Sequence, residues 1–160
     1  MAKYNLVSRV DWRTLRPNRA GVIVYTCHHN KLIFAFGSDT LYDELTDFGG
    51  GVKYHKDGNA VNGALRELME ESLYVFGVVK ESQVQTSFVI YDEATAIFFV
   101  YLKTDPKEVS HLFRRRSEVL DYLEVNEIVW LTLPELIKAL GQSIIYSKVR
   151  DLIVSSGLFT

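Results

Sequence analysis

The stretch that decides the fold runs from Gly49-Gly50-Gly51, through a polar loop, to Arg66-Glu67-Leu68-Met69-Glu70-Glu71. Residues 60–73 are predicted to form one helix. At about 100° per residue, the four charged side chains of the hexapeptide fall within roughly 140° of arc. The opposite side holds Val61, Leu65, Leu68 and Met69. The helix is therefore amphipathic, with a core face and a dense acidic face that contains one arginine.

The acidic face has two interpretations. Many glutamate-rich helix faces are solvated surface, because glutamate is a good helix former. However, Glu67 lies within one helical turn of both Glu70 and Glu71, and like charges at these spacings repel. A divalent cation removes that repulsion, and carboxylate oxygens suit Mg²⁺ or Mn²⁺. The preceding glycines free the backbone for positive φ and for close approach of phosphate oxygens, which favours a ligand-binding face.

Strand-like and helix-like segments alternate around this helix. Predicted strands cover residues 21–27, 32–36, 85–91, 95–102 and 128–131, with a hairpin turn at 28–31. Predicted helices cover residues 134–140, capped by Thr132, and 146–155, while residues 107–122 are predicted as a helix with a loop. The order indicates a sheet with helices packed on it, in the α/β (α+β) class.

The length and composition fit one soluble domain over residues 1–160. Hydrophobic residues make up 48% of the chain, charged residues 24%, and the net charge is −2. This charge does not favour nonspecific binding to nucleic acid. The dense basic cluster Arg114-Arg115-Arg116 is expected to be a solvated face, with a phosphate or RNA contact as the alternative.

The single cysteine and the hydropathy pattern bear on the cellular location of the protein and on whether it has a disulfide or a Cys/His metal site. Cys27 has no disulfide partner and is predicted to be a small core residue, and the adjacent His28-His29 pair has no third ligand nearby. The start of the chain lacks a signal-peptide pattern. No apolar run reaches the ~20 residues that span a membrane, so a cytoplasmic protein is expected.

The segment from Gly50 to Leu73 resembles the Nudix box of the Nudix hydrolases, because Arg66-Glu67-Leu68-Met69-Glu70-Glu71 follows a glycine-rich loop and Ala64-Leu65. Glu127, with Trp130 before Pro134-Glu135-Leu136, extends a looser resemblance over most of the chain. The resemblance implies an α/β/α sandwich with a mixed central sheet. It also implies metal-dependent hydrolysis of a phosphoanhydride bond in a nucleoside diphosphate linked to a group X, such as a nucleoside triphosphate or a nucleotide sugar.

The resemblance assigns roles to individual residues. Glu67, Glu70 and Glu71 would bind Mg²⁺ or Mn²⁺, with the carbonyl of Gly50 or Gly51 completing the shell. Glu70 or Glu71 would also act on the attacking water, and Arg66 would orient Glu67. Gly49, Gly50 and Gly51 would contact the substrate. The catalytic base is often a glutamate outside the box, for which Glu127 is the first candidate and Glu124 the second.

The box departs from the family pattern at two points. Ser72 stands where the pattern has glycine. The loop is one residue longer, so Gly58 occupies the position of a supporting glutamate, unless the extra residue lies near Arg66 and Asp57 takes its place. The departure keeps open a catalytically weak binding module.

The group X and the partners remain open. Tyr25, Phe34 and Phe88 are candidates to stack a base, as are Tyr91, Phe99 and Tyr101, although aromatic residues in strands are usually core. An enzyme directed at capped RNA is the third interpretation, which the acidic balance disfavours. Homodimers are common in the family, but no residue here demonstrates one.

Overall fold

A computed structural model describes residues 1–159, which form one mixed eight-stranded sheet. The strands are β1 (Lys3–Leu6), β2 (Arg19–His28), β3 (Lys31–Asp39), β4 (Leu45–Thr46), β5 (Phe48–Gly51), β6 (Phe88–Tyr91), β7 (Thr95–Tyr101) and β8 (Val125–Thr132). The main path runs β1-β6-β7-β2-β3-β4, with β5 paired to β2 and β8 paired to β3. Only the β2–β7 pairing is parallel, so the sheet is mixed as predicted.

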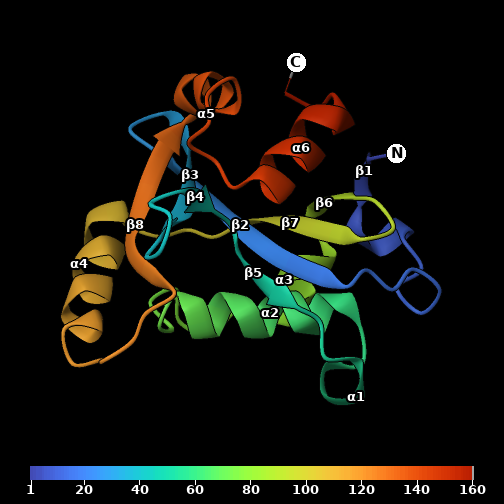
Figure 1. The fold of residues 1–160 in the computed structure, drawn as a ribbon, viewed down its shortest axis with the longest axis horizontal. Helices are drawn as coiled ribbons and strands as arrows, with labels where there is room; N and C mark the ends of the chain where they lie inside the picture. The colour runs from blue at the N-terminus through green and yellow to red at the C-terminus, as the bar shows by residue number, and fades with distance from the viewer. Residues whose placement is uncertain (160) are drawn as a thin grey trace.

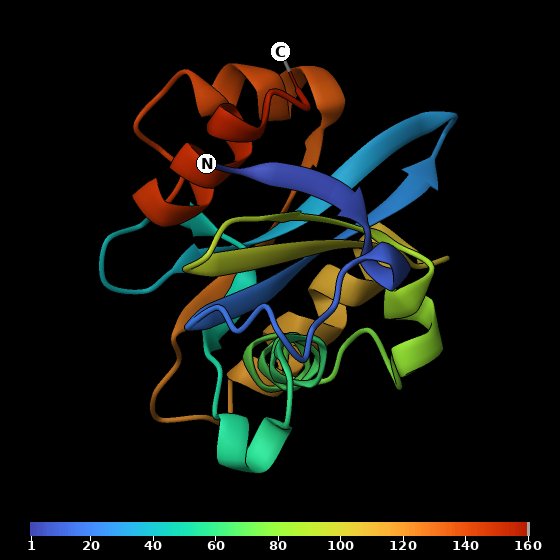
Figure 2. The same ribbon diagram turned by 90° about the vertical axis from the view of Figure 1, so that its right-hand side faces the viewer.

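Helices cover both faces of this sheet (Figure 1). They are α1 (Tyr54–Asp57), α2 (Ala60–Glu71), α3 (Glu81–Gln85), α4 (Pro106–Ser117), α5 (Leu133–Leu140) and α6 (Ser147–Ser156), with a 3-10 turn at Val7–Arg9. In Figure 2, α2 is seen end-on beneath the strands, while α5 and α6 lie above them. The predicted α/β/α sandwich is confirmed. Within residues 1–159 there is no helix whose length and apolar character would suit a membrane span.

Strand β2 shows why the sheet is buried on both sides. Val22 and Val24 point into a core shared with α2, whereas Ile23 points into a second core shared with α5 and α6. All three side chains are fully buried. A strand that helices cover on both faces has a continuous run of apolar residues, whereas a half-exposed strand alternates apolar and polar residues. The buried strand predicted from this run is therefore confirmed.

Local contacts and backbone angles mark both ends of helix α2. The side chain of Asn59 accepts a hydrogen bond from the backbone N–H of Asn62, which satisfies one free donor of the first turn. At the other end, Ser72 is the C-cap, and Leu73 and Tyr74 follow with positive φ values of 55° and 60°. The Ser72 hydroxyl is buried and makes no hydrogen bond. The helix thus stops at the position where the Nudix box has glycine.

Several predicted elements are confirmed, and others need correction. His29 and Asn30 form the β2–β3 turn with φ of 51° and 63°. The strand predicted from residue 85 begins only at Phe88, because α3 occupies 81–85. The loop predicted at 53–59 contains α1. The prediction that Cys27 is buried is wrong, because its side chain is exposed near the end of β2.

Candidate functional site

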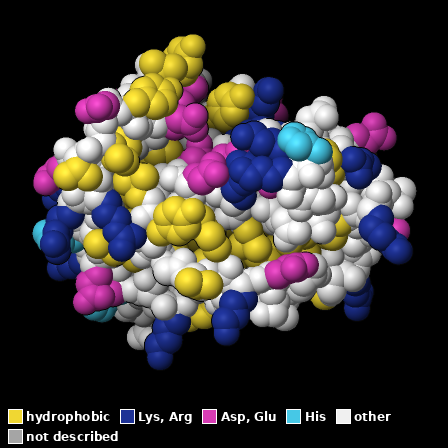
Figure 3. All heavy atoms as spheres, turned by 90° about the horizontal axis from the view of Figure 1, so that it is seen from below, with side chains coloured by type: hydrophobic (Ala, Val, Ile, Leu, Met, Phe, Trp, Pro, Cys, Tyr) yellow, Lys and Arg dark blue, Asp and Glu magenta, His cyan; other side chains and the backbone are white. Residues whose placement is uncertain are grey.

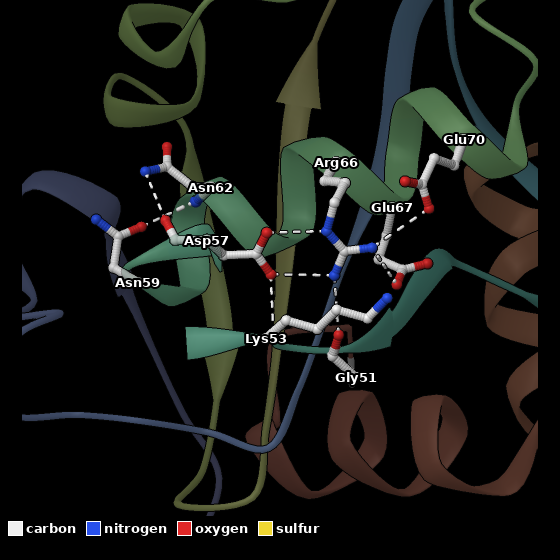
Figure 4. Close-up of polar contacts among 8 residues, drawn as sticks. All are labelled: Gly51, Lys53, Asp57, Asn59, Asn62, Arg66, Glu67 and Glu70. Atoms are coloured by element: carbon white, nitrogen blue, oxygen red, sulfur yellow. Dashed lines mark hydrogen bonds and ion pairs between the residues drawn. The ribbon is translucent and has the colours of Figure 1, made fainter. Parts of the chain in front are cut away.

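Arg66 is the centre of a hydrogen-bond network on the acidic face of α2 (Figure 4). Its Nη1 donates to Glu67 Oε1 at 3.1 Å and to Glu70 Oε2 at 3.3 Å. Its Nη2 donates to the carbonyl oxygen of Gly51 at 3.0 Å. The guanidinium therefore ties two of the three box glutamates to the neighbouring strand β5, and it fixes the direction of Glu67 most closely.

Asp57 is the principal acidic partner of Arg66. Its Oδ1 accepts from Nε at 2.8 Å and its Oδ2 from Nη2 at 3.0 Å, which is a bidentate pair. Oδ2 also accepts from the backbone N–H of Lys53 at 2.9 Å. These bonds hold the pKa of Asp57 below its usual value. Of the two alternatives for the position of the supporting glutamate, Asp57 contacts Arg66, whereas Gly58 has φ +84° and faces open space.

The three glycines form strand β5 and not a loop. Gly49, Gly50 and Gly51 pair with Gly21, Ala20 and Arg19 of β2, and none of the three has positive φ. Close approach is what they provide. A Cβ on Gly49 would meet the Asp47 carboxylate at 2.9 Å, and one on Gly50 would meet the Glu67 carboxylate at 2.7 Å. The expected positive φ is wrong. The groups that lie close to Gly49 and Gly50 are carboxylates of the protein, and the close approach of phosphate oxygens stays a prediction.

A glycine series separates these effects. In Gly50→Ala, the new methyl should push the Glu67 carboxylate away from Arg66. The hydrolysis that the resemblance implies should then fall by about tenfold or more, while stability changes little. Gly49→Ala should lower the melting temperature, because its Cβ would meet the Gly21 backbone at 2.8 Å. Gly141→Ala is the control, because its Cβ would meet only the Lys138 carbonyl oxygen, at an ordinary 3.5 Å, at the end of α5. Thermal melts measure stability and turnover measures activity. Equal activity in the Gly50 and Gly141 variants would contradict the assignment.

Glu71 has a different environment from the other box glutamates. Its Oε1 is buried and has no hydrogen-bond partner in the part of the chain that the structure describes. Burial, followed by the neighbouring carboxyl groups of Glu124, Asp47 and Glu67, raises the pKa of Glu71 to about 10. Burial also raises the pKa of Glu67, although Arg66 opposes this effect. The positive charge near this cluster of carboxyl groups is therefore too small to offset the burial of Glu71 and Glu67.

Two cavities meet at this cluster, and Glu71 and Glu124 line both. The first, here called the box cavity, has a volume of about 420 Å³ and is lined by Lys53, Arg66, Glu67, Glu70 and both strand glycines Gly50 and Gly51. The second, here called the Arg19 cavity, has a volume of about 310 Å³. In Figure 3, acidic side chains lie between hydrophobic side chains on one side and Lys or Arg side chains on the other.

Solved structures share this arrangement of strands and helices. C. elegans Ap4A hydrolase matches with a TM-score of 0.51 at 17% identity, covering 90% of this chain and 98% of that one. The Nudix domain of Shewanella oneidensis NrtR, solved with ADP ribose, matches with a TM-score of 0.53 at 11% identity, covering 96% of each chain. The chain has the Nudix fold. No family model matches the chain, and no curated protein matches it by sequence.

Within the Nudix fold, the two glutamates proposed as bases lie in different places. Glu124 lies just before β8 and lines both cavities. Glu127 lies within β8 opposite Ser38, and it is exposed and lines neither cavity. A register shift in the β3–β8 pairing at Ser38/Asp39 accompanies buried positions at Val125 and Ile128, which leaves Glu127 outside the cleft. The structure therefore brings the second candidate, Glu124, to the box carboxylates.

The aromatic residues proposed to stack a base lie elsewhere. Phe34 and Phe99 are buried in the core beneath α5 and α6, and Tyr25 and Phe88 pack against that core. Tyr91 packs against the other core, and Tyr101 contacts the ring of Tyr25. None of the six lines the box cavity or the Arg19 cavity. The aromatic residues of the cleft are Tyr42, Tyr122 and Tyr146, which sequence reasoning missed because they lie in turns and at a helix start.

The basic cluster on α4 has a structural contact. Arg116 donates to the carbonyl oxygen of Leu73 at 2.7 Å and so satisfies a backbone group where the chain leaves α2. Arg114 and Arg115 are exposed. The predicted solvated face is therefore confirmed for these two arginines, while Arg116 holds the end of the box helix against α4.

The box residues fit a divalent cation. Glu71 Oε1 is an orphaned buried acceptor, and the missing Cβ of Gly50 leaves room for the Glu67 carboxylate beside β5. The donors are hard oxygens, which suit Mg²⁺ or Mn²⁺. Among residues 1–159, however, no three His, Cys, Asp or Glu side chains already converge on one point. Glu67 and Glu70 pair with Arg66 instead.

Proposed function

We propose that this chain is a divalent-cation-dependent hydrolase that cleaves a phosphoanhydride bond in a nucleoside diphosphate linked to a group X. The observation that carries the proposal is the buried, unpartnered Oε1 of Glu71 beside Glu67 and Glu124. A buried carboxylate oxygen without a partner is unfavourable unless a cation accompanies it. The two Nudix-fold neighbours, an Ap4A hydrolase and a domain solved with ADP ribose, support a nucleotide as the ligand.

The box cavity would hold the phosphates. A bound Mg²⁺ or Mn²⁺ supplies charge neutralisation and a more acidic water. Glu67, Glu70 and Glu71 would hold it, together with the carbonyl oxygen of Gly50. Lys53 lines the same cavity and makes no ion pair within residues 1–159, so its ammonium group is free to bind phosphate oxygens. Arg66 keeps Glu67 oriented and is a positioning residue, because all its donors are engaged by the protein.

Glu124 is the residue we assign as the proton acceptor for the attacking water. It is exposed, so its carboxylate stays accessible to water, and it lies beside Glu71 at the boundary of the two cavities. A base must lie within hydrogen-bond reach of the water it deprotonates. Glu127, outside the cleft, has no such access.

The test is turnover on a panel of nucleoside triphosphates, nucleotide sugars, dinucleoside polyphosphates, ADP-ribose and capped RNA with Mg²⁺ or Mn²⁺. Release of phosphate and nucleotide should depend on the cation and should fall by about 100-fold in Glu70→Gln. Glu81→Gln is the matched control, because Glu81 lies on α3 and lines neither cavity. Turnover identifies X and the cleaved bond.

Absence of turnover from folded protein on every substrate would overturn the enzyme proposal and favour a nucleotide-binding module. The NrtR domain solved with ADP ribose is a Nudix-fold protein in a nucleotide complex, which gives this second reading its basis. Titration of ADP-ribose into the metal-free protein would then distinguish a binding module from an inert fold. A small-molecule nucleotide partner, a cytoplasmic location and little affinity for nucleic acid are part of the same proposal.

A further inference from the structure

The Arg19 cavity is built by segments distant in sequence. Tyr42 and Glu44 come from the β3–β4 turn, Tyr122 and Glu124 from the α4–β8 connection, and Tyr146 from the start of α6. The backbone N–H of Thr40 donates to the carbonyl oxygen of Glu124 at 3.0 Å, which joins the first two segments. The backbone N–H of Tyr146 donates to Leu45 at 2.8 Å, which joins the third. The cavity walls are therefore tied together.

Two of its tyrosines are exposed without an obvious structural reason. Tyr42 is 74% exposed and Tyr122 is 70% exposed, and neither ring contacts another ring within residues 1–159. Asp39 accepts from the backbone N–H of Tyr42 at 2.9 Å, so the turn that presents this ring is itself held in place. Exposed aromatic rings at the mouth of a cavity offer flat surfaces on which a planar ring can stack.

The base of the cavity carries a fixed ion pair. Asp47 is fully buried, and Arg19 donates to it through Nη1 at 3.0 Å and also through Nη2. Burial alone would lower the pKa of Arg19, but the Asp47 carboxylate outweighs this and raises the pKa overall. The Arg19 guanidinium also lies over the ring of Tyr146, with its Cζ 5.6 Å from the ring centroid. Arg19, the only cation that lines this cavity among residues 1–159, is therefore already neutralised.

The remaining charged groups of the cavity are carboxyls. Glu44 is half-buried, and its carboxylate has no hydrogen bond or ion pair within residues 1–159. Asp39 is engaged by its own turn, and Glu71 and Glu124 belong to the boundary with the box cavity. A cavity of this character repels phosphate and accepts hydrogen bonds. Its ligand must present N–H donors beside a planar surface.

We propose that the Arg19 cavity binds the base of the substrate, and that this base is a purine whose edge presents adjacent N–H donors, as guanine does. The proposal rests on the proposed function, because it places the phosphates across Glu71 in the box cavity. Glu44 accepts from the donor edge, since a carboxylate can receive two parallel N–H bonds. Tyr122 and Tyr42 supply the stacking surface.

Equilibrium dialysis of free nucleosides against the metal-free protein tests this without requiring hydrolysis. Guanosine should bind about tenfold more tightly than adenosine or uridine, because a paired hydrogen-bond contact discriminates by this amount. Glu44→Gln should abolish that preference, and Tyr122→Ala should weaken guanosine about tenfold. Glu93→Gln and Tyr4→Ala are matched controls, because both residues are exposed and lie outside the cavity.

The outcomes separate this proposal from the proposed function. Guanosine binding that falls in both cavity variants, and not in the controls, supports the base site even if no substrate is hydrolysed. No nucleoside binding overturns the base site, even if the panel shows turnover. Equal binding of all three nucleosides, or competition by inorganic phosphate, also overturns it. Circular dichroism of each variant shows whether a loss reflects unfolding.

Discussion

The Glu71→Gln variant should lose hydrolysis by about two orders of magnitude or more and yet be more stable than the parent protein when no cation is present. In the parent, the Glu71 carboxyl is buried, and its Oε1 has no partner. Glutamine keeps the shape, cannot ionise and can donate to Glu124. The measurements are turnover with Mg²⁺ and thermal melts with a chelator.

The raised pKa of Glu71 determines how the stability difference between Glu71→Gln and the parent changes with pH. The pKa of Glu71 is raised to about 10 in the folded protein, from 4.5 as an ordinary glutamate. Folding therefore favours the protonated form, and the stability of the parent falls as pH rises between these two values. Glutamine does not titrate. The melting temperature of the variant minus that of the parent should become more positive from pH 6 to pH 9.

Added cation should reverse the order. Mg²⁺ or Mn²⁺ should raise the melting temperature of the parent and much less that of Glu71→Gln, because a ligand stabilises only the state that binds it. Glu81→Gln should follow the parent under every condition. A Glu71→Gln variant that is less stable than the parent at pH 9, or that retains full turnover, would refute the role of Glu71 as a cation ligand.

The sequence was sufficient to predict the core of the site but not its surroundings. Arg66, Glu67, Glu70 and Glu71 lie on one helix, so their juxtaposition follows from helical periodicity alone. Glu124 and Glu127, by contrast, differ by three positions in an irregular strand start. A register shift of one residue moves a side chain to the other face of a sheet, so sequence could not choose between them.

The cavity residues that the sequence did not predict were missed for physical reasons. Arg19 and Asp47 form a buried pair only because β5 returns beside β2, and both Gly21 and Gly49 leave room for the Asp47 carboxylate. Such long-range pairing leaves no local pattern in the chain. The tyrosines of the Arg19 cavity lie in turns, where exposure is the ordinary expectation. Burial of Cys27 was predicted wrongly because an apolar run does not show where its helical cover ends.

Asp57→Ala is expected to have the largest effect on stability, lowering the free energy of unfolding by about 3 kcal/mol. The Asp57 side chain is 4% exposed and that of Arg66 is 13% exposed, so solvent replaces little of the lost bidentate pair. The lowered pKa of Asp57 means that the same stabilisation is present above about pH 4 and is lost as pH falls through the folded pKa. Urea unfolding at pH 7 measures the cost.

Asp151→Ala is the matched control, because the Arg150–Asp151 pair is 38% and 70% exposed and should contribute less than about 1 kcal/mol. In the Arg66→Met background, Asp57→Ala should lower the free energy of unfolding much less than in the parent. The Arg66 guanidinium, which Asp57→Ala leaves without its partner in the parent, is absent there. Asp57→Ala should also raise the Mg²⁺ concentration required for turnover by about tenfold, because Arg66 then ceases to orient Glu67. If Asp57→Ala cost no more than Asp151→Ala, Asp57 would not be the residue that takes the place of the box glutamate, and the longer loop would leave Arg66 supported by Glu67, Glu70 and Gly51 alone.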